Sequence, residues 1–190
     1  MNNILIPAAV ALVLTAACVP SALQNTQEME AKLKRLADAD LTEAKLEPYA
    51  KIGNSTILGQ AFLKTRGGDV KLAAGNPVVL FPASEYISFV FSTMAAIATT
   101  GTKYPITRAD MLALSKKITE GVDARILRFK RVATVDAAGN FEFSGLPAGE
   151  YMLFCAIYWE TGMGETGGLT HATVRIGDND ARKVILNETF

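Results

Sequence analysis

From Ser55 onward, apolar positions come in short groups separated by Gly, Asn, Asp and Pro. Phe141 and Phe143 alternate with polar residues, which is typical of a strand with one buried face. Residues 151–159 are apolar on both faces and therefore predict a central strand. Short strands separated by turn residues predict a mostly β fold, an antiparallel β-sandwich. The further predicted strands are 57–64, 70–72, 78–81, 125–135, 169–176 and 183–186.

The N-terminal part before the sandwich has a different pattern. Residues 28–39 place Leu33 and Leu36 on one narrow apolar stripe, which predicts a helix. This N-terminal helix either docks on its own domain or binds a partner. Residues 19–27 are small and polar and predict a tether. Pro48 predicts the end of any helix before the sandwich begins.

A helical insertion is predicted at about 84–123. Residues 87–100 are apolar and uncharged, so their periodicity leaves a strand or a buried helix open, and we favour the helix. Thr107 and Asp110 have the spacing of a helix N-cap and an acid that reaches back to it, and Gly121 predicts the end of that helix. An exposed apolar insertion of this size would mark a surface that binds another protein.

The chain begins with a short apolar segment, residues 4–17, which is followed by Cys18. This segment is shorter than the roughly 20 residues that a membrane-spanning helix needs. The small residues Ala16 and Ala17 predict a secretory signal that is cleaved between Ala17 and Cys18. The order of these residues resembles the lipobox of bacterial lipoproteins, with Thr15 in the position where leucine is most common.

The lipobox resemblance implies a covalent lipid on Cys18, a diacylglyceryl thioether usually joined by a third acyl chain such as palmitate. Val19 in place of Asp implies sorting to the outer membrane. Two or three acyl chains give stable anchoring, whereas one does not. The alternative is an ordinary signal peptide cleaved after Ala17. The predicted organisation is a signal peptide at 1–17, a lipid anchor, tether and helix at 18–50, and the β-sandwich with its insertion at 51–190.

Residues 134–151 combine a turn with Asp and Gly, a Phe-x-Phe strand and the sequence Leu-Pro-x-Gly-x-Tyr. They resemble the carboxypeptidase regulatory-like domain, a transthyretin-like β-sandwich, and 58–62 and 76–80 resemble its first two strands. Gly139 permits the tight turn, and Tyr151 can bury its ring while its hydroxyl bonds to the backbone. The resemblance implies an accessory or assembly role and no peptidase activity.

Composition and the few reactive side chains argue against catalysis. Lys+Arg 19 and Asp+Glu 19 leave no net charge, which gives no argument for a nucleic-acid partner. With Cys18 acylated, Cys155 has no intrachain partner, and it is predicted to be a buried, inert thiol. His171, the only histidine, is predicted to face solvent. Two such side chains are too few for a zinc site, and 136–140 and 178–180 predict turns rather than Ca²⁺ sites. We therefore predict no catalytic residues, no metal and no cofactor apart from the lipid.

Residues 162–168 are rich in glycine and predict a mobile loop at one end of the sandwich. Tyr158, Trp159 and Met163 at its entrance either form a binding patch or cap the open end of the core. We expect a non-enzymatic structural or docking subunit of an outer-membrane envelope assembly, with a protein partner or further copies of itself. The alternative is a periplasmic or surface module that binds glycan or peptidoglycan through this loop.

Overall fold

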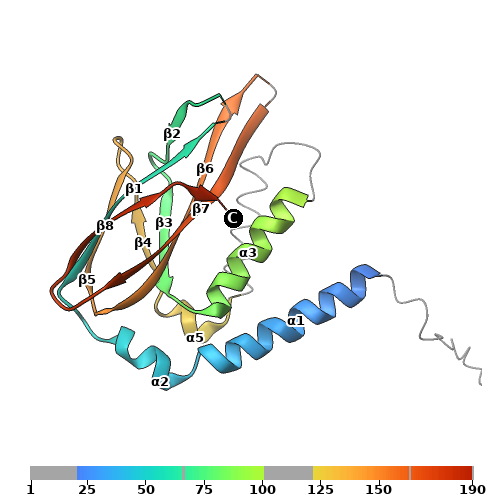
Figure 1. Ribbon diagram of the computed structural model, residues 1–190, viewed down its shortest axis with the longest axis vertical. Helices are drawn as coiled ribbons and strands as arrows, with labels where there is room; N and C mark the ends of the chain where they lie inside the picture. The colour runs from blue at the N-terminus through green and yellow to red at the C-terminus, as the bar shows by residue number, and fades with distance from the viewer. Residues whose placement is uncertain (1–20, 66, 101–121, 163, 190) are drawn as a thin grey trace, which may run out of the picture.

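The computed structural model describes residues 21–65, 67–100, 122–162 and 164–189, which form a sandwich of two β-sheets with helices along one side (Figure 1). The strands are β1 (Ser55–Lys64), β2 (Val70–Leu72), β3 (Pro77–Pro82), β4 (Arg131–Thr134), β5 (Asn140–Leu146), β6 (Gly149–Thr161), β7 (Gly164–Ile176), β8 (Ala181–Leu186) and β9 (Glu188–Thr189). One sheet has the order β2-β1-β5, with β8 also paired to β1, and the other has the order β4-β3-β6-β7-β9. The pairing is antiparallel except between β1 and β8. The predicted mostly β, antiparallel β-sandwich is therefore confirmed.

The main core lies between the two sheets and follows the alternation of the strands. In β5, Phe141 and Phe143 are buried while Glu142 between them is exposed, as predicted. Ile57 of β1 and Leu153 of β6 are fully buried in the same cluster. Burial of side chains of this size contributes about 1.5–3 kcal/mol each, so this cluster is the principal source of stability.

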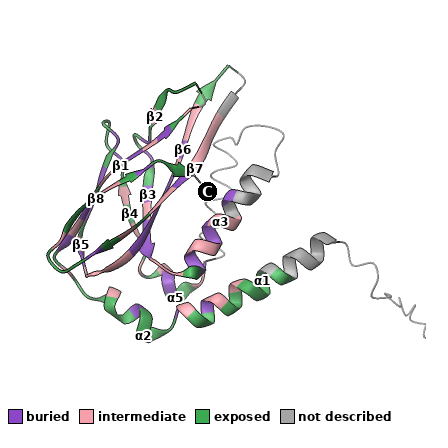
Figure 2. Cartoon of the chain, in the orientation of Figure 1, coloured by how far each residue is buried: buried purple, intermediate pink, exposed green. Residues whose placement is uncertain are grey.

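A second apolar cluster lies on the outer face of the β3-β6-β7 sheet, because β6 is apolar on both faces. Phe154 of β6 points outward and stacks on Phe91, with ring centroids 3.4 Å apart. Figure 2 shows buried residues on the described part of the helix that covers this sheet, and exposed stretches along β8 of the other sheet. The helical elements are α1 (Ser21–Asp40), α2 (Glu43–Leu46), the 3₁₀ turn η1 (Glu47–Ala50), α3 (Glu85–Thr100) and α5 (Ala124–Leu127).

Helix α3 confirms the helical interpretation of residues 87–100. Ser84 caps it, since its hydroxyl accepts a hydrogen bond from the Ile87 amide at 3.1 Å. Asp40 of α1 accepts a second one from the Tyr86 amide at 3.0 Å. Tyr86, Ile87 and Phe91 are buried against the sheet. This part of the insertion thus covers its own sheet, so it does not meet the condition of an exposed apolar surface. The helix predicted from Thr107 lies outside the described residues.

The N-terminal segment differs from its prediction in two ways. Helix α1 begins at Ser21, so residues 21–27 are helical and not part of a tether. The helix ends at Asp40, and Pro48 occupies the start of η1, where its missing N–H costs no hydrogen bond. The docked alternative is confirmed for α1, because Leu33 and Leu36 pack against the second cluster. No helix within the described ranges is long and apolar enough to cross a membrane.

The strand predicted over 125–135 is confirmed at 131–134, where β4 lies, and is wrong for the residues before it. Residues Ala124–Leu127 form the helical turn α5, which Asp123 caps by accepting a hydrogen bond from the Arg125 amide at 2.9 Å. Ile126 of this turn is fully buried in the second cluster. A short segment with one buried apolar residue can form either a strand or a single helical turn. In this segment the capping aspartate is the feature that favours the helical turn.

The turn and crossover that carry the family resemblance have the predicted geometry. Asp136 accepts hydrogen bonds from the Ala138 and Asn140 amides, both at 2.8 Å. These bonds, with that from the Asn140 side chain, hold the pKa of the Asp136 carboxyl below its usual range. Tyr151 is buried and its hydroxyl donates to the Pro147 carbonyl at 2.8 Å, which ties the crossover from β5 to β6 to the core.

Candidate functional site

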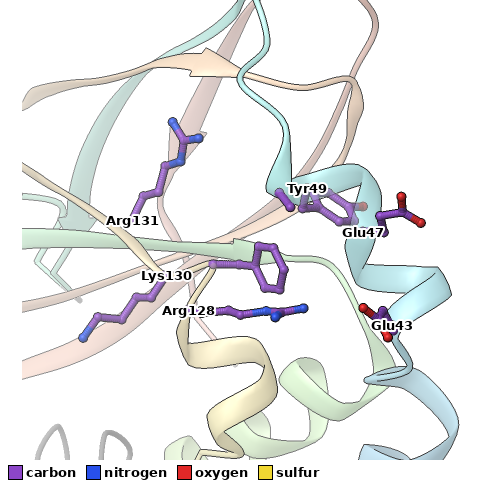
Figure 3. Close-up of a pocket in the computed structure, with 8 residues that line it drawn as sticks. Glu43, Glu47, Tyr49, Arg128, Lys130 and Arg131 are labelled. Carbon is purple, nitrogen blue, oxygen red and sulfur yellow. The ribbon is translucent and has the colours of Figure 1, made fainter.

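A groove lies where the N-terminal helical segment meets the α5–β4 segment (Figure 3). It has a volume of about 530 Å³. One wall comes from α2 and η1, and the other comes from the end of α5 and the start of β4. The residues that line it are Glu43, Glu47, Tyr49, Ala50, Arg128, Phe129, Lys130 and Arg131.

The basic wall of the groove comes from a short run of sequence that contains Arg125, Arg128, Lys130 and Arg131. Arg128 lies over the ring of Phe129, with its guanidinium carbon 4.7 Å from the ring centroid. Arg131 donates hydrogen bonds to the carbonyls of Ser144 and Gly145 at 3.0 and 3.4 Å. These contacts hold two of the cations on the rim of the groove.

The acidic wall faces this basic one. In Figure 3 the Arg128 side chain points toward Glu43, while Glu47 lies further along the same wall. No ion pair within 4 Å joins Arg128, Lys130, Glu43 or Glu47 to any residue in the part of the chain that the structure describes. A ligand with hydroxyl, carboxylate or amine groups could therefore bind these charges without breaking an existing pair.

The floor of the groove is anchored by Tyr49. Its hydroxyl donates to the Glu150 carbonyl at 3.2 Å and accepts from the Glu150 amide at 3.3 Å. Its ring meets that of Tyr151 edge to face, with centroids 5.3 Å apart. The ring also fills the space that a Cβ on Gly149 would occupy, which explains the glycine at this position. The groove thus has a rigid base on the crossover, and burial raises the pKa of Tyr151 well above its usual range.

Next to the groove, Arg125 holds the N-terminal segment in place. It bonds to Asp123 at 2.8 Å and reaches Asp38 of α1 at 3.5 Å. The Arg125 side chain lowers the pKa of the Asp123 carboxyl. On the buried side of this junction, the Tyr86 hydroxyl accepts from the Asp123 amide at 2.8 Å, and burial raises the pKa of Tyr86.

The predicted binding loop does not form as expected. Strands β6 and β7 continue as a paired ribbon up to Thr161 and Gly164, so residues 164–168 are strand and not loop. Trp159 is half-buried and packs against the main core, which favours its role as a cap on the core. Tyr158 is half-buried beside it, and Met163 lies outside the described residues. The glycine at 167 fits the close approach of the two strands, since a Cβ at this position would collide with the β6 backbone.

The two reactive side chains are separated in the fold. Cys155 is buried in the main core, and burial raises the pKa of its thiol to about 12. His171 lies on β7, opposite Phe154 on the helix-covered face, and is half-buried, which corrects the expectation that it faces solvent. Across the described ranges, no three His, Cys, Asp or Glu residues gather as metal ligands. Cys18 and the cleavage position at Ala17 lie outside those ranges.

The groove was missed by the sequence analysis, because its walls are about 80 residues apart and the basic run was assigned to a strand. The signal that could have indicated it is the density of cations, four in the seven residues from Arg125 to Arg131. In a half-buried strand, charged residues alternate with apolar ones, and the cations of this run do not follow that spacing.

Similarity to a solved structure supports the fold. A protein of Pseudomonas aeruginosa, described as a candidate carbohydrate-binding protein, is similar at a TM-score of 0.59 and 21% identity, over 77% of this chain and 97% of that chain. The major pilin subunit of Bacillus cereus matches at a TM-score of 0.39 and 14% identity, over 73% of this chain and 30% of that one. The minor pilin of Streptococcus agalactiae matches at a TM-score of 0.35 and 14% identity, over 72% of this chain and 44% of that one. No model of a known protein family matches the chain, and no curated protein sequence matches it.

Proposed function

We propose that this chain is a non-enzymatic docking module of the bacterial cell envelope, anchored to the outer membrane by a lipid on Cys18. The sequence supports the anchor, because Cys18 follows a short apolar segment that ends in small residues. Helix α1 begins at Ser21, three positions after this cysteine. A lipid on Cys18 would thus enter the membrane next to an ordered helix.

The observation that carries the proposal is the way α1 joins the sandwich. Its last turns pack through Leu33, Leu36 and Ala37 on the helix-covered sheet, and Asp40 bonds to α3. From there α1 extends away from the sandwich (Figure 1). A helix of 20 residues is about 30 Å long, so an anchor at its start would hold the sandwich at a defined distance and orientation. Such an arrangement suits a module that presents a surface to a partner.

The anchor is tested by replacing Cys18 with alanine in the full chain. The expected result is loss of the protein from the outer-membrane fraction and loss of the lipid mass from the mature N-terminus. Cys155→Ala is the matched control, because its thiol is buried and its removal should leave the location unchanged. A Cys18→Ala protein that remains in the outer membrane, or a wild-type N-terminus without lipid, would contradict the anchor.

A second candidate function is the binding of glycan or peptidoglycan. The groove favours it, because planar Arg and Glu side chains beside Tyr49 and Phe129 suit a ligand rich in hydroxyl and carboxylate groups. The similarity in fold to a candidate carbohydrate-binding protein adds support. For this candidate function we place the binding site in the groove and not in the region around Trp159.

Binding at the groove is tested with a panel of glycans and peptidoglycan fragments against the full chain. Arg128→Ala and Glu43→Gln should each weaken binding, whereas Arg182→Ala, an exposed arginine elsewhere, should not. The absence of binding across the whole panel would remove this candidate and leave the docking role intact.

A further inference from the structure

The outer face of the β2-β1-β5 sheet, together with β8, carries exposed apolar side chains. Leu58 of β1 is 37% exposed, and Ile185 of β8 is 56% exposed. Val70 and Leu72 of β2 are 55% and 41% exposed. The helices in the described ranges pack on the other sheet, through the second cluster. We call this surface the open face; its residues are Leu58, Val70, Leu72, Glu142, Lys183 and Ile185.

The register of the strands places a charge on each side of Leu58. Leu58 is paired with Glu142 of β5 on one side and with Lys183 of β8 on the other. Register partners project from the same face of a sheet, so the three side chains form a row that reads acidic, apolar, basic. Since neighbouring strands are about 4.8 Å apart, the two charged residues are about 10 Å apart. Neither forms an ion pair within the described part of the chain.

We propose that the open face binds the open face of a second copy of this chain, about a two-fold axis parallel to β1. Rotation about such an axis places β1 over β1 and β5 over β8 of the second copy. Leu58 then faces Leu58 of the second copy, at the same height along the axis. Glu142 faces Lys183 of the second copy, and the symmetry makes this pair twice. The row is thus complementary to itself in this orientation, which is the reason to infer a second copy and not an unrelated partner.

The geometry of this dimer agrees with known sheet packing and with a shared membrane. Sheets pack face to face about 10 Å apart with their strands roughly aligned. An axis parallel to the strands leaves both chains pointing the same way along it, so both α1 helices can lead to one membrane. Tethering in one membrane raises the effective concentration, so that a modest apolar area suffices. In this respect the inference rests on the docking role proposed above and names its partner.

The first experiment crosslinks the full chain in native membranes. Leu58→Cys lies next to the two-fold axis, so a short bis-maleimide should join two copies through this position. Val132→Cys is the matched control, because Val132 is more exposed than Leu58, at 53%, but lies on β4 of the other sheet. The wild-type chain controls for Cys18, and Cys155 is too buried to react. Several-fold more dimer from Leu58→Cys than from Val132→Cys supports the proposal, and equal yields overturn it.

The second experiment exchanges the charges of the row in full-length protein purified in mild detergent. Glu142→Lys or Lys183→Glu alone places like charges opposite each other and should raise the dimer Kd at least about tenfold. The double variant restores opposite charges and should recover a Kd close to that of wild type, measured by sedimentation. Single variants without effect, or a double variant that does not recover, would overturn the arrangement. Loss of the lipid in Cys18→Ala concerns the anchor alone, so the two proposals can fail separately.

Discussion

The two sheets of the sandwich share one core but differ in what covers their outer faces. Strand β6 is buried on both faces, and α1, α3 and α5 supply the cover for its outer one. Strand β1 alternates between buried and partly exposed positions, and its outer face carries Leu58 in contact with solvent. A strand that is apolar on both faces requires a second layer to cover it, whereas an alternating strand leaves one face available for a partner.

The largest expected effect is on the helix-covered sheet. Phe154→Ala removes a buried ring that stacks on Phe91, and it should lower the free energy of unfolding by about 3–5 kcal/mol. Leu58→Ala on the open face of the other sheet should cost less than about 1 kcal/mol in the monomer. Urea denaturation measures both. Similar losses at the two positions would mean that the outer faces do not differ as described.

The next largest effect is expected on the inner face of the β2-β1-β5 sheet. A Cβ on Gly59 would enter the ring of Phe141, which covers this glycine. Gly59→Ala should therefore cost about 1–3 kcal/mol of unfolding free energy, because the ring must shift within a packed core. Gly177→Ala is the control, since nothing lies within 4 Å of its Cβ position. If Gly59→Ala is as harmless as this control, the inner face is less tightly packed than its burial indicates.

A smaller effect is expected where the N-terminal segment meets the crossover. Tyr49→Phe keeps the ring against Tyr151 but removes the hydroxyl that bonds to both backbone groups of Glu150. The expected loss is about 0.5–1.5 kcal/mol, measured by thermal unfolding. A stability equal to that of wild type would show that the base of the groove does not depend on this hydroxyl.

The smallest effect is a pH dependence from Cys155. Because burial raises the pKa of this thiol from 9.0 to about 12, the unfolded chain loses the proton first as the pH rises. The stabilising contribution is complete below about pH 9 and is lost as the pH rises from there toward 12. At pH 9.5 the loss should be under about 1 kcal/mol. Cys155→Ala should reduce this part of the pH dependence, and an unchanged slope would contradict the burial of a neutral thiol.

Much of the sandwich was predictable because its signals are local. The alternation of Phe141 and Phe143 identified β5, and the spacing of Asp136 and Asn140 identified the turn before it. The hydroxyl of Tyr151 bonds to a carbonyl four residues earlier, which is also a local relation. Such features depend on neighbours within a few residues, so the sequence alone contains them.

The errors share a different cause. The glycines of 164–168 predict a loop in isolation, but pairing with β6 extends β7 through them. The alternation of residues along β7 predicts that His171 faces solvent, but its face of β7 lies on the side that the helices cover. The groove beside α5 depends on α2 and η1, which are distant in sequence from the basic run. Each outcome was decided by an element that no local window contains.

Local sequence patterns predicted most of the strands, the turn at 136–140, the crossover from β5 to β6, and a lipid on Cys18. These follow from the period of apolar residues and from side chains that bond to nearby backbone. The covered outer face, the groove between charged walls and the row of side chains on the open face all depend on contacts between elements that are distant in sequence. Glu142 and Lys183 follow Leu58 by 84 and 125 residues in the sequence, and the three side chains become neighbours only through the register of the sheet.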